Sequence, residues 1–453
     1  MKIILILISL LLYFFAPMRY DYNFCLVCFL FGLVQILYIM KDDWKMFGFL
    51  NFNTIFFFSF VFVSFVFPVF VFPITTEFYG IMGLINTNVI SKATALCLVA
   101  LTCYCVYYQK AAKKYSKYAY NKLLVEDIST SVPKKIYLLS FSALLLQLVF
   151  NIATRGWEEI TSLPFIISIY EVALPFVLIS NCAKLGKMNL RQFININKFT
   201  LLSALCICMI YIILGDRGPV IICGMSILVT YWMYVGRISL VKLLPLLFVG
   251  VLLMYALRLT RGTDDSISSA GVSGFISVAN QGISGTGFIF LFSDLIYICR
   301  ELYFGFERTM QFGLFHPEKI FVIPFTPFPF LPTIISDLFI GIPFDKLHSG
   351  VQLNSFMASN FGESTSFGTH CVIDIFMSWG IIGVVFSFSL FGFLMGSISY
   401  KKEINLYYKM FFVIIMCLAL YIPRDQIYAM IRPMAYAAFF VWILYKNKFI
   451  LSR

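Results

Sequence analysis

Charged residues are scarce in this sequence of 453 residues. Asp, Glu, Lys and Arg make up only 12% of it, whereas a soluble globular chain carries about 25%. Hydrophobic residues account for 60%, aromatic residues for 18%, and the mean hydropathy is +0.89. This leaves too little polar surface to solvate a water-soluble fold, and far too much apolar surface for a disordered chain. The composition therefore excludes a cytosolic enzyme, a secreted disulfide scaffold and a disordered regulator.

Catalytic and metal-binding motifs are also lacking. The chain has three histidines and shows neither a Ser/His/Asp constellation nor an HExxH motif. Cys25 and Cys28 have CxxC spacing, but they stand in an apolar run without a second pair, which favours packing inside a membrane helix. Asp264 and Asp265 could bind a divalent cation, although capping a helix in the loop is the simpler interpretation. We expect no metal ion and no cofactor.

Long apolar runs recur along the whole chain, and each is long enough to cross about 30 Å of hydrocarbon. The first resembles a signal peptide without a cleavage site, so we interpret it as an uncleaved helix. The sequence predicts an all-α polytopic integral membrane protein with one membrane domain: nine spans in residues 1–260, a large loop at 261–370, and three spans in 371–453. The twelve predicted spans are 3–17, 23–40, 47–74, 85–108, 136–153, 162–182, 199–214, 219–236, 243–260, 371–399, 406–423 and 427–445.

Positive charge is distributed unevenly over the predicted loops. With the N-terminus in the cytoplasm, the cytoplasmic loops and the C-terminal tail contain 22 of the 34 basic residues, 19 of them lysine. This is the positive-inside pattern, and it predicts that both termini are cytoplasmic and that the large loop faces outward.

The remaining twelve basic residues have a different composition, with nine arginines and three lysines. Orientation needs only positive charge, whereas the planar guanidinium group grips phosphate or carboxylate with two parallel hydrogen bonds. The split predicts an anionic, phosphorylated ligand on the outer face. The alternative is that some of these arginines pair with nearby acidic residues. The acidic candidates are Glu158, Glu159, Glu301 and Glu307.

The large outer loop has three distinct parts. Residues 285–306 are apolar with a few charges, which suits a helix lying on or dipping into the membrane. Residues 323–332 contain four prolines, which exclude a regular helix, and their alternating phenylalanines form an aromatic wall that could stack on sugar rings or pack on the membrane domain. A stretch rich in serine and glycine follows and could bind sugar hydroxyls through His348, Glu363 and His370.

Charged residues inside predicted spans are the next candidates, because a charge in the bilayer core is paired or functional by default. Glu171 lies in the sixth span, Arg432 in the last, and Asp374 one turn into the tenth, on the same predicted face as His370. Arg424 precedes Arg432 by eight residues, which predicts two arginines about two turns apart on one helix. A simple ion pair between Glu171 and Arg432 is the alternative.

Two further arginine sites lie at predicted span ends. Arg217 occupies the tight turn GDRGP between the seventh and eighth spans, where the flanking glycines allow the backbone to approach a ligand closely. Arg258 and Arg261 are three residues apart and share a face where the ninth span leaves the membrane.

The order of these motifs resembles a known family. The G-x-R-G loop GDRGPVIICG, a basic outer helix end, a late large loop, the helix SFGTHCVIDIFMSWGIIGVVF and the tail PRDQIYAMIRP are together similar to the oligosaccharide repeat-unit (O-antigen, Wzy-type) polymerases of bacterial inner membranes. The similarity covers most of residues 200–445 and is carried by the order and topology of short motifs.

The resemblance implies a glycosyltransferase whose active site faces the periplasm. Its substrates would be undecaprenyl-pyrophosphate-linked glycans, and the growing chain would move onto the non-reducing end of a new lipid-linked unit. Arg217, Arg424 and Arg432 would stabilise the departing pyrophosphate by motif position, with Arg258 and Arg261 as less consistent matches. His348, His370, Glu363 and Asp374 are candidates for a general base by location only.

Two other functions fit the same topology. An O-antigen ligase would transfer the chain to lipid A–core and would also use outer arginines and a loop histidine. A lipid-linked oligosaccharide flippase or another transporter is less favoured, because the two halves show no clear repeat and the polar residues gather at the outer span ends. The expected partners are lipid-linked glycans and the bilayer, with a chain-length regulator and a flippase as further candidates and no nucleic acid.

Overall fold

Every regular element in the described part of the chain is a helix. The computed structural model describes residues 2–74, 85–117, 131–155, 164–183, 185–213, 218–236, 293–361 and 369–451. Contacts divide the chain into two units, which we describe separately. The first comprises Met1–Tyr120, Leu295–Lys401 and Ala419–Ile431, and the second comprises Asn121–Asp294, Lys402–Leu418 and Arg432–Arg453.

Eight of the described helices are long and apolar enough to cross a membrane. They match eight of the twelve predicted spans, so the prediction of an all-helical fold is confirmed for the described residues, and the length and composition of these helices fit a polytopic membrane protein. Three more predicted spans coincide with shorter apolar helices, α1 (Lys2–Phe14), α8 (Gly218–Tyr234) and α16 (Leu406–Leu418). The ninth predicted span, residues 243–260, lies outside the described residues. The number of crossings and their orientation stay predictions.

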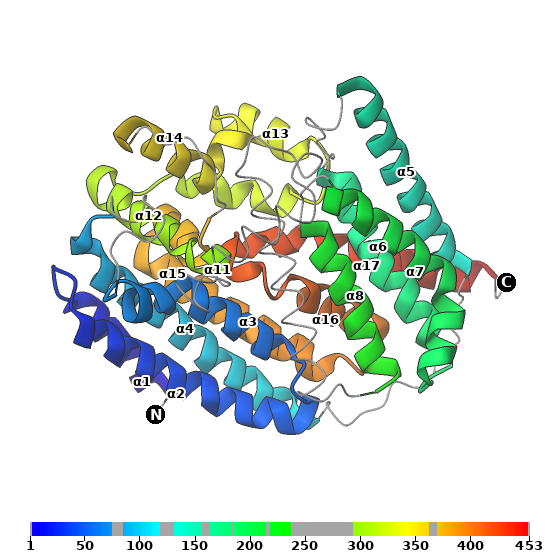
Figure 1. Cartoon of the computed structure of the whole chain (residues 1–453), viewed down its shortest axis with the longest axis horizontal. Helices are drawn as coiled ribbons and strands as arrows, with labels where there is room; N and C mark the ends of the chain where they lie inside the picture. Colours follow the sequence, from blue (N-terminus) through cyan, green and yellow to red (C-terminus); the bar gives the residue numbers. More distant parts are fainter. Residues whose placement is uncertain are drawn as a thin grey trace, which may run out of the picture. The chain divides into compact units, whose positions relative to one another are not determined.

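The core of the first unit is the pair α4 (Thr87–Tyr115) and α15 (Cys371–Lys401), which lie side by side (Figure 1). The two backbones come close because α15 carries glycine at positions 392 and 396. A Cβ atom on Gly392 would lie 2.3 Å from the Tyr104 carbonyl oxygen, and one on Gly396 would lie 2.8 Å from the Tyr108 carbonyl oxygen. This is the small-xxx-small spacing that membrane helices use for tight association.

Helices α1, α2 (Tyr22–Phe47), α3 (Phe52–Val61) and the π-helix η1 (Phe62–Val71) complete this part of the unit. A buried polar cluster joins α2, α3 and α4. The Tyr108 hydroxyl donates a hydrogen bond of 2.9 Å to the Asp43 carboxylate, and the Asn53 amide donates to the same group. The Tyr104 hydroxyl in turn donates to Asn53. Such a fully bonded network fixes the register of neighbouring helices.

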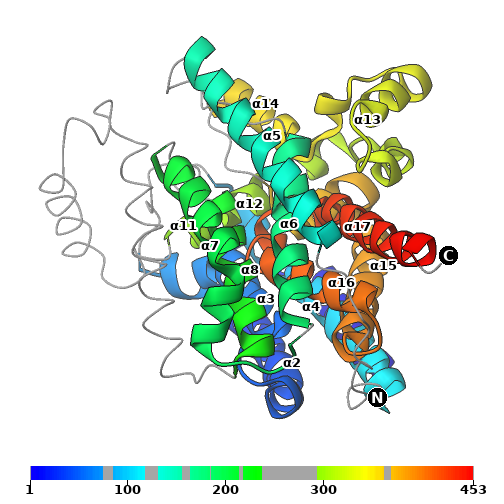
Figure 2. The same ribbon diagram turned by 90° about the vertical axis from the view of Figure 1, so that its right-hand side faces the viewer.

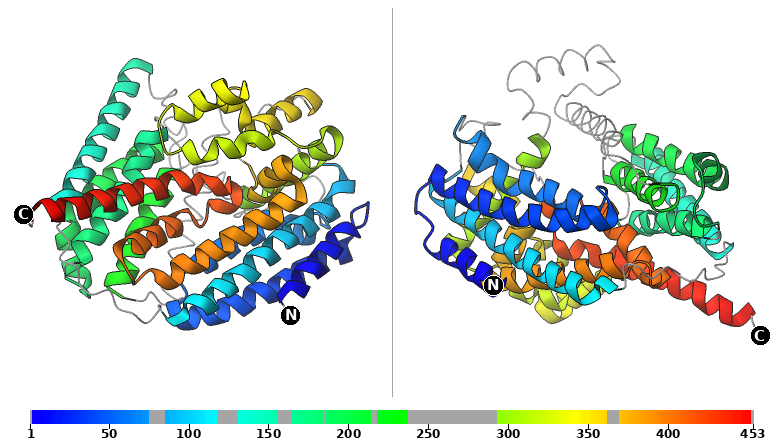
Figure 3. Two further views of the ribbon diagram at one scale, coloured as in Figure 1. Left: turned by 180° about the vertical axis from the view of Figure 1, so that it is seen from behind. Right: turned by 90° about the horizontal axis from the view of Figure 1, so that it is seen from below.

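The described part of the predicted outer loop folds into short helices beside α15. They include α12 (Cys299–Phe312), α13 (Leu331–Ile335) and α14 (Ser349–Phe361), which lie together in Figures 1 and 3. Residues 299–306 are helical as predicted, but they are buried against α15 and α4 rather than exposed on a surface. The 3₁₀ turn Pro317–Phe321 (η5) precedes the proline-dense segment 323–332. That segment forms the 3₁₀ turn Ile323–Phe325 (η6) and then irregular backbone, and regular α-helix begins only at its last two residues, where α13 starts.

The second unit contains α5 (Ser131–Arg155), α6 (Pro164–Ala183), α7 (Leu190–Ile213), α8, α16 and α17 (Ile431–Leu451). Figure 2 shows α6, α7 and α8 side by side, and these three helices pack on one another. Glu171 of α6 lies close enough to Cys223 of α8 and Cys417 of α16 to interact with them electrostatically. It is partly buried, as a charge inside a helix bundle is expected to be.

The chain between α16 and α17 is irregular, which corrects one prediction. Arg424 ends the 3₁₀ turn Ile422–Arg424 (η9), and Asp425 and Gln426 then have extended backbone. A second 3₁₀ turn, Ile427–Met430 (η10), leads into α17. Arg424 and Arg432 therefore do not lie two turns apart on one helix. Pro423 explains the break, because proline cannot donate the backbone hydrogen bond that continues a helix.

Candidate active site

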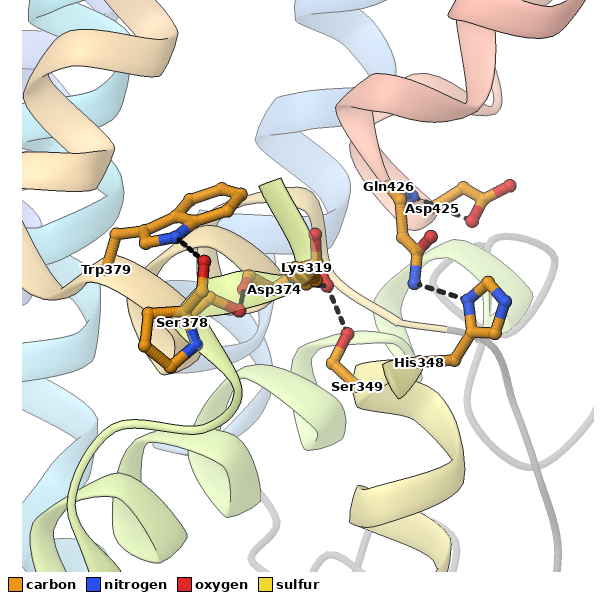
Figure 4. A network of polar contacts seen from close by, with 9 residues as sticks. Lys319, His348, Ser349, Asp374, Ser378, Trp379, Asp425 and Gln426 are labelled. Atoms are coloured by element: carbon orange, nitrogen blue, oxygen red, sulfur yellow. Dashed lines mark hydrogen bonds and ion pairs between the residues drawn. The ribbon is translucent and has the colours of Figure 1, made fainter. Parts of the chain in front are cut away.

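Three segments of the first unit bring polar side chains together near the start of α15. They are η5 with its flanking residues, the beginning of α14 with the preceding 3₁₀ turn Phe344–Leu347 (η8), and the irregular segment 419–430. Figure 4 shows the residues that meet there. Irregular backbone is tolerated inside a membrane protein where it is buried in protein or lines a cavity, and several transporters build binding sites from such breaks.

Asp374, in the first turn of α15, is the centre of this cluster. Its Oδ1 atom accepts a hydrogen bond of 2.9 Å from the Lys319 ammonium group of η5. The same oxygen accepts a hydrogen bond from the Ser349 hydroxyl at the start of α14. Both charged side chains are almost completely buried, with exposed fractions of 3% for Lys319 and 0% for Asp374. The sequence predicted that Asp374 is either paired or functional. The structure shows an ionic partner for it, Lys319.

Two aromatic rings flank the Lys319 ammonium group. The rings of Trp379 and Tyr428 each have their centroid 5.3 Å from Nζ, which is within cation–π range. The Trp379 indole also donates a hydrogen bond of 2.8 Å to the Pro317 carbonyl oxygen. These contacts hold η5 against α15 and shield the ion pair from water. Removal of one partner of such a buried pair strongly destabilises the protein, because the other charge is left buried without a counter-charge.

His348 directly precedes Ser349 in the chain and therefore lies beside this ion pair. Its Nδ1 atom is 3.3 Å from the side-chain amide of Gln426, and its ring packs on Phe344 with a centroid separation of 4.9 Å. The side chain is partly exposed. The amide and the phenylalanine ring together fix the orientation of the imidazole.

Arg424 and Asp425 immediately precede Gln426. The Arg424 guanidinium group lies 5.7 Å from the centroid of the Tyr421 ring and is partly exposed. Asp425 keeps contact with solvent, but the surrounding protein desolvates it. This desolvation, with a smaller contribution from the Asp374 carboxylate, raises the pKa of Asp425 to about 6. The site therefore combines a cationic group, a histidine and a carboxyl group whose pKa is raised.

His370 is a different kind of residue from His348. It is completely buried, its Nδ1 accepts a hydrogen bond of 3.2 Å from the Val372 amide, and its Nε2 lies 3.1 Å from the Ser64 hydroxyl. Burial lowers the pKa of His370 to about 3, so the ring is neutral at physiological pH. His370 does not share the contacts of Asp374, although the spacing predicted one face. Its geometry favours a structural role at the start of α15.

One predicted outer arginine is paired with an acidic neighbour. The buried Arg300 donates a hydrogen bond of 2.7 Å to Glu301, and another of 2.8 Å to the Tyr297 hydroxyl. The ion-pair alternative is thus confirmed for Arg300. Arg308 stacks on Phe315 at 4.8 Å and does not join the cluster around Asp374.

The other predicted site residues are distributed as follows. Arg432 is the second residue of α17 in the second unit and is partly buried. Arg217, Arg258, Arg261 and Glu363 lie outside the described residues, so their roles, like the pairing of Glu171 with Arg432, stay predictions.

Sequence reasoning missed Lys319, Ser349 and Gln426 as members of the site. Lys319 was one of twelve basic residues on the predicted outer side, and nothing in its neighbourhood linked it to Asp374, which is 55 residues away. Gln426 stands in the tail motif PRDQ, but only the arginine was singled out there.

Within the described ranges, no group of three or more His, Cys, Asp and Glu residues could hold a metal ion. No family model matches the chain, and searches of curated proteins and of solved structures found no significant match either. The cluster around Asp374 and the sequence motifs are therefore the features of this chain that point to a function.

Proposed function

We propose that this protein is a membrane glycosyltransferase of the oligosaccharide repeat-unit polymerase type. In this proposal it joins undecaprenyl-pyrophosphate-linked glycans at the periplasmic face of the bacterial inner membrane. The growing chain is transferred from its lipid pyrophosphate to the non-reducing end of a new lipid-linked unit. No cofactor takes part.

The main support for the proposal is the contact between His348 and the segment Arg424–Gln426. The sequence predicted a role for His348 by its location in the loop and for Arg424 by its position in the tail motif, 76 residues apart. A hydrogen bond between His348 and Gln426 places their segments next to each other in the first unit. A base beside an anion-binding cation is the minimum that transfer from a pyrophosphate donor requires.

The reaction follows from these two groups. A hydroxyl oxygen of the acceptor sugar forms a bond to the anomeric carbon of the donor chain, while the bond from that carbon to the pyrophosphate oxygen breaks. His348 takes the proton of the hydroxyl. Arg424 stabilises the negative charge that develops on the departing pyrophosphate. Arg217, Arg258, Arg261 and Arg432 stay predicted pyrophosphate-binding residues on the basis of the sequence alone.

Deletion of the protein in its bacterial host tests the proposal. Loss of a polymerase leaves lipid A–core carrying a single repeat unit, because ligation of one unit still occurs. Loss of a ligase or a flippase leaves core without any repeat unit. We expect the single-unit band on a lipopolysaccharide gel, and bare core would refute the polymerase assignment in favour of those two alternatives.

Substitution of His348 tests the site within the same assay. We expect His348→Asn to shorten the ladder to one or two units, because general-base catalysis contributes about 10²–10⁴-fold in rate. His316→Asn is a matched control in the same loop, since His316 pairs with Glu318 at 2.8 Å and asparagine tolerates its left-handed backbone. Equal ladders from both variants at normal protein levels would remove His348 from the mechanism.

Arg217→Lys and Arg432→Lys should also shorten the chains, because lysine cannot grip a phosphate with two parallel hydrogen bonds.

A further inference from the structure

The chain contacts α15 at Lys319, moves away from it, and contacts the same residue of α15 again at Ser349. Lys319 and Ser349 both bind Oδ1 of Asp374, so residues 320–348 form an excursion whose two ends are fastened to one carboxylate. Inside the excursion, Pro332 and Leu347 are buried, and the Ser336 hydroxyl donates a hydrogen bond to the Ile342 carbonyl oxygen. The excursion is thus a defined substructure with its own internal contacts.

Its outward surface is apolar to an unusual degree. Phe330, Leu338 and Phe339 have exposed fractions of 76%, 75% and 81%. Between residues 320 and 340 the only charged residue is Asp337. Additional exposed apolar side chains in this segment are Ile320, Phe321, Phe328 and Ile334. A segment that exposes this many large apolar side chains with one charge among them favours an interaction site over a water-exposed face.

The apolar surface begins where the lipid-facing side of α15 begins. The chain before η5 is fixed to α15 by hydrogen bonds from the Phe315 amide to the Met377 carbonyl oxygen and from the Trp379 indole to the Pro317 carbonyl oxygen. Gly380, with φ 62° and ψ −159°, kinks α15 directly after Trp379, and beyond this kink Ile382 is 80% exposed on a segment of membrane-spanning length. Tryptophan with a hydrogen-bonded indole is a residue that commonly lies at a membrane–water boundary. Ile320 and Phe321 follow closely after Pro317, to which Trp379 is hydrogen-bonded.

The chemistry of the exposed side chains distinguishes lipid from sugar. A sugar-binding aromatic platform needs hydrogen-bonding groups beside the rings to hold the hydroxyls. Here the exposed rings alternate with proline and stand beside leucine and isoleucine, and Thr333 and Asp337 are the exposed polar side chains of α13 and of the following π-helix, Ser336–Ile340 (η7). Aliphatic side chains with few polar partners match acyl chains better than a glycan.

We propose that residues 320–340 dock into the lipid leaflet on the side where α15 begins, with Phe330, Leu338 and Phe339 among the acyl chains. Asp374 holds the two ends of the excursion at the boundary, and the apolar tip enters the leaflet. This inference is independent of the proposed enzymatic function, because it rests only on exposure, charge and the attachment to α15.

Photocrosslinking from single positions tests this directly. The photoreactive residue p-benzoylphenylalanine would replace Phe330, Phe339 or Lys346, one at a time, in the full chain. Each protein would be placed in nanodiscs of phosphatidylethanolamine and phosphatidylglycerol at a 3:1 ratio and irradiated. Lys346 is a matched control position, because it is exposed in the same excursion but lies outside residues 320–340. We expect about tenfold more phospholipid adduct from positions 330 and 339 than from position 346, because the same photoreactive group is surrounded by acyl chains at the first two positions and stays on the polar side of the boundary at the third.

Two outcomes would overturn the inference. Equal phospholipid labelling at all three positions would mean that the tip does not enter the leaflet. Crosslinks from positions 330 and 339 to a second copy of the chain, without lipid adducts, would assign the apolar surface to self-association. Should a photoreactive variant fail to fold, Phe339→Trp in nanodiscs containing brominated lipid gives a second measurement: quenching beyond that of the parent protein supports docking, and unchanged quenching refutes it.

Discussion

At the scale of single residues, the most informative side chain is that of Asp374. Its position inside an apolar segment predicted that it would be paired or functional. The identity of its partner was not predictable, because Lys319 belongs to a different segment and nothing in the local pattern connects the two. Sequence patterns reveal which charges need a partner, whereas the partner is chosen by tertiary packing.

The Lys319–Asp374 pair makes a quantitative prediction about stability. Asp374→Leu leaves a buried ammonium group without its carboxylate, and Lys319→Met leaves the reverse, so each single variant should lose about 3–5 kcal/mol. The double variant removes both charges and should recover most of that loss. Thermal unfolding of the purified proteins in nanodiscs measures the cycle. A double variant whose loss equals the sum of the two single losses would show that the pair is not coupled.

His370 predicts a pH dependence of stability. Its folded pKa of about 3 lies below the ordinary value of 6.5, so the unfolded chain binds a proton that the folded chain does not. Stability is therefore complete above pH 6.5 and falls as the pH drops toward 3. At pH 5 this one group should cost about 2 kcal/mol. His370→Gln should have a flatter profile of unfolding temperature between pH 7 and pH 5 than the unsubstituted protein, and parallel profiles would contradict this role.

At the scale of elements, the sequence predicted helices well and their interruptions less well. Apolar length identified eight helices of spanning length, because burial of apolar side chains and internal hydrogen bonding leave few alternatives inside a membrane. The break between α16 and α17 was predicted only in part. Pro423 was visible in the sequence, yet two arginines spaced by eight residues suggested a continuous helix through it. The hydrogen-bonding consequence of a single proline outweighed that spacing.

The contact between α4 and α15 provides a test of element packing. Gly392→Ala places a methyl group 2.3 Å from the Tyr104 carbonyl oxygen, so the two helices must move apart. Overpacking of this kind costs about 1–3 kcal/mol, and the unfolding temperature should fall accordingly. Gly224→Ala in α8 is the matched control: nothing lies within 4 Å of its added methyl group, and alanine is the better helix former. The unfolding temperature should fall in Gly392→Ala and not in Gly224→Ala, and equal values would contradict the close packing of α4 and α15.

At the scale of the whole molecule, the distribution of lysine predicts a topology that the helices alone do not determine. The eight long helices have the length and composition needed to cross a membrane. The three shorter ones, α1 with 13 residues, α8 with 17 and α16 with 13, span about 20–25 Å and need local thinning of the bilayer to cross. If all eleven cross, the two termini lie on opposite sides. The positive-inside pattern places both termini in the cytoplasm, and this requires one more crossing, for which residues 243–260 are the predicted segment.

Reporter fusions separate these possibilities. A fluorescent protein that folds only in the cytoplasm, and a phosphatase that is active only in the periplasm, would be fused at the C-terminus and after residues 237 and 262 in matched truncations. We expect fluorescence at 237 and at the C-terminus and phosphatase activity at 262, because lysine-rich loops are retained on the cytoplasmic side. The same reporter active at 237 and 262 would show that residues 243–260 do not cross. In that case the C-terminus should show phosphatase activity if the other eleven helices all span. The arginines predicted to face outward would then have to be assigned again to one side of the membrane or the other.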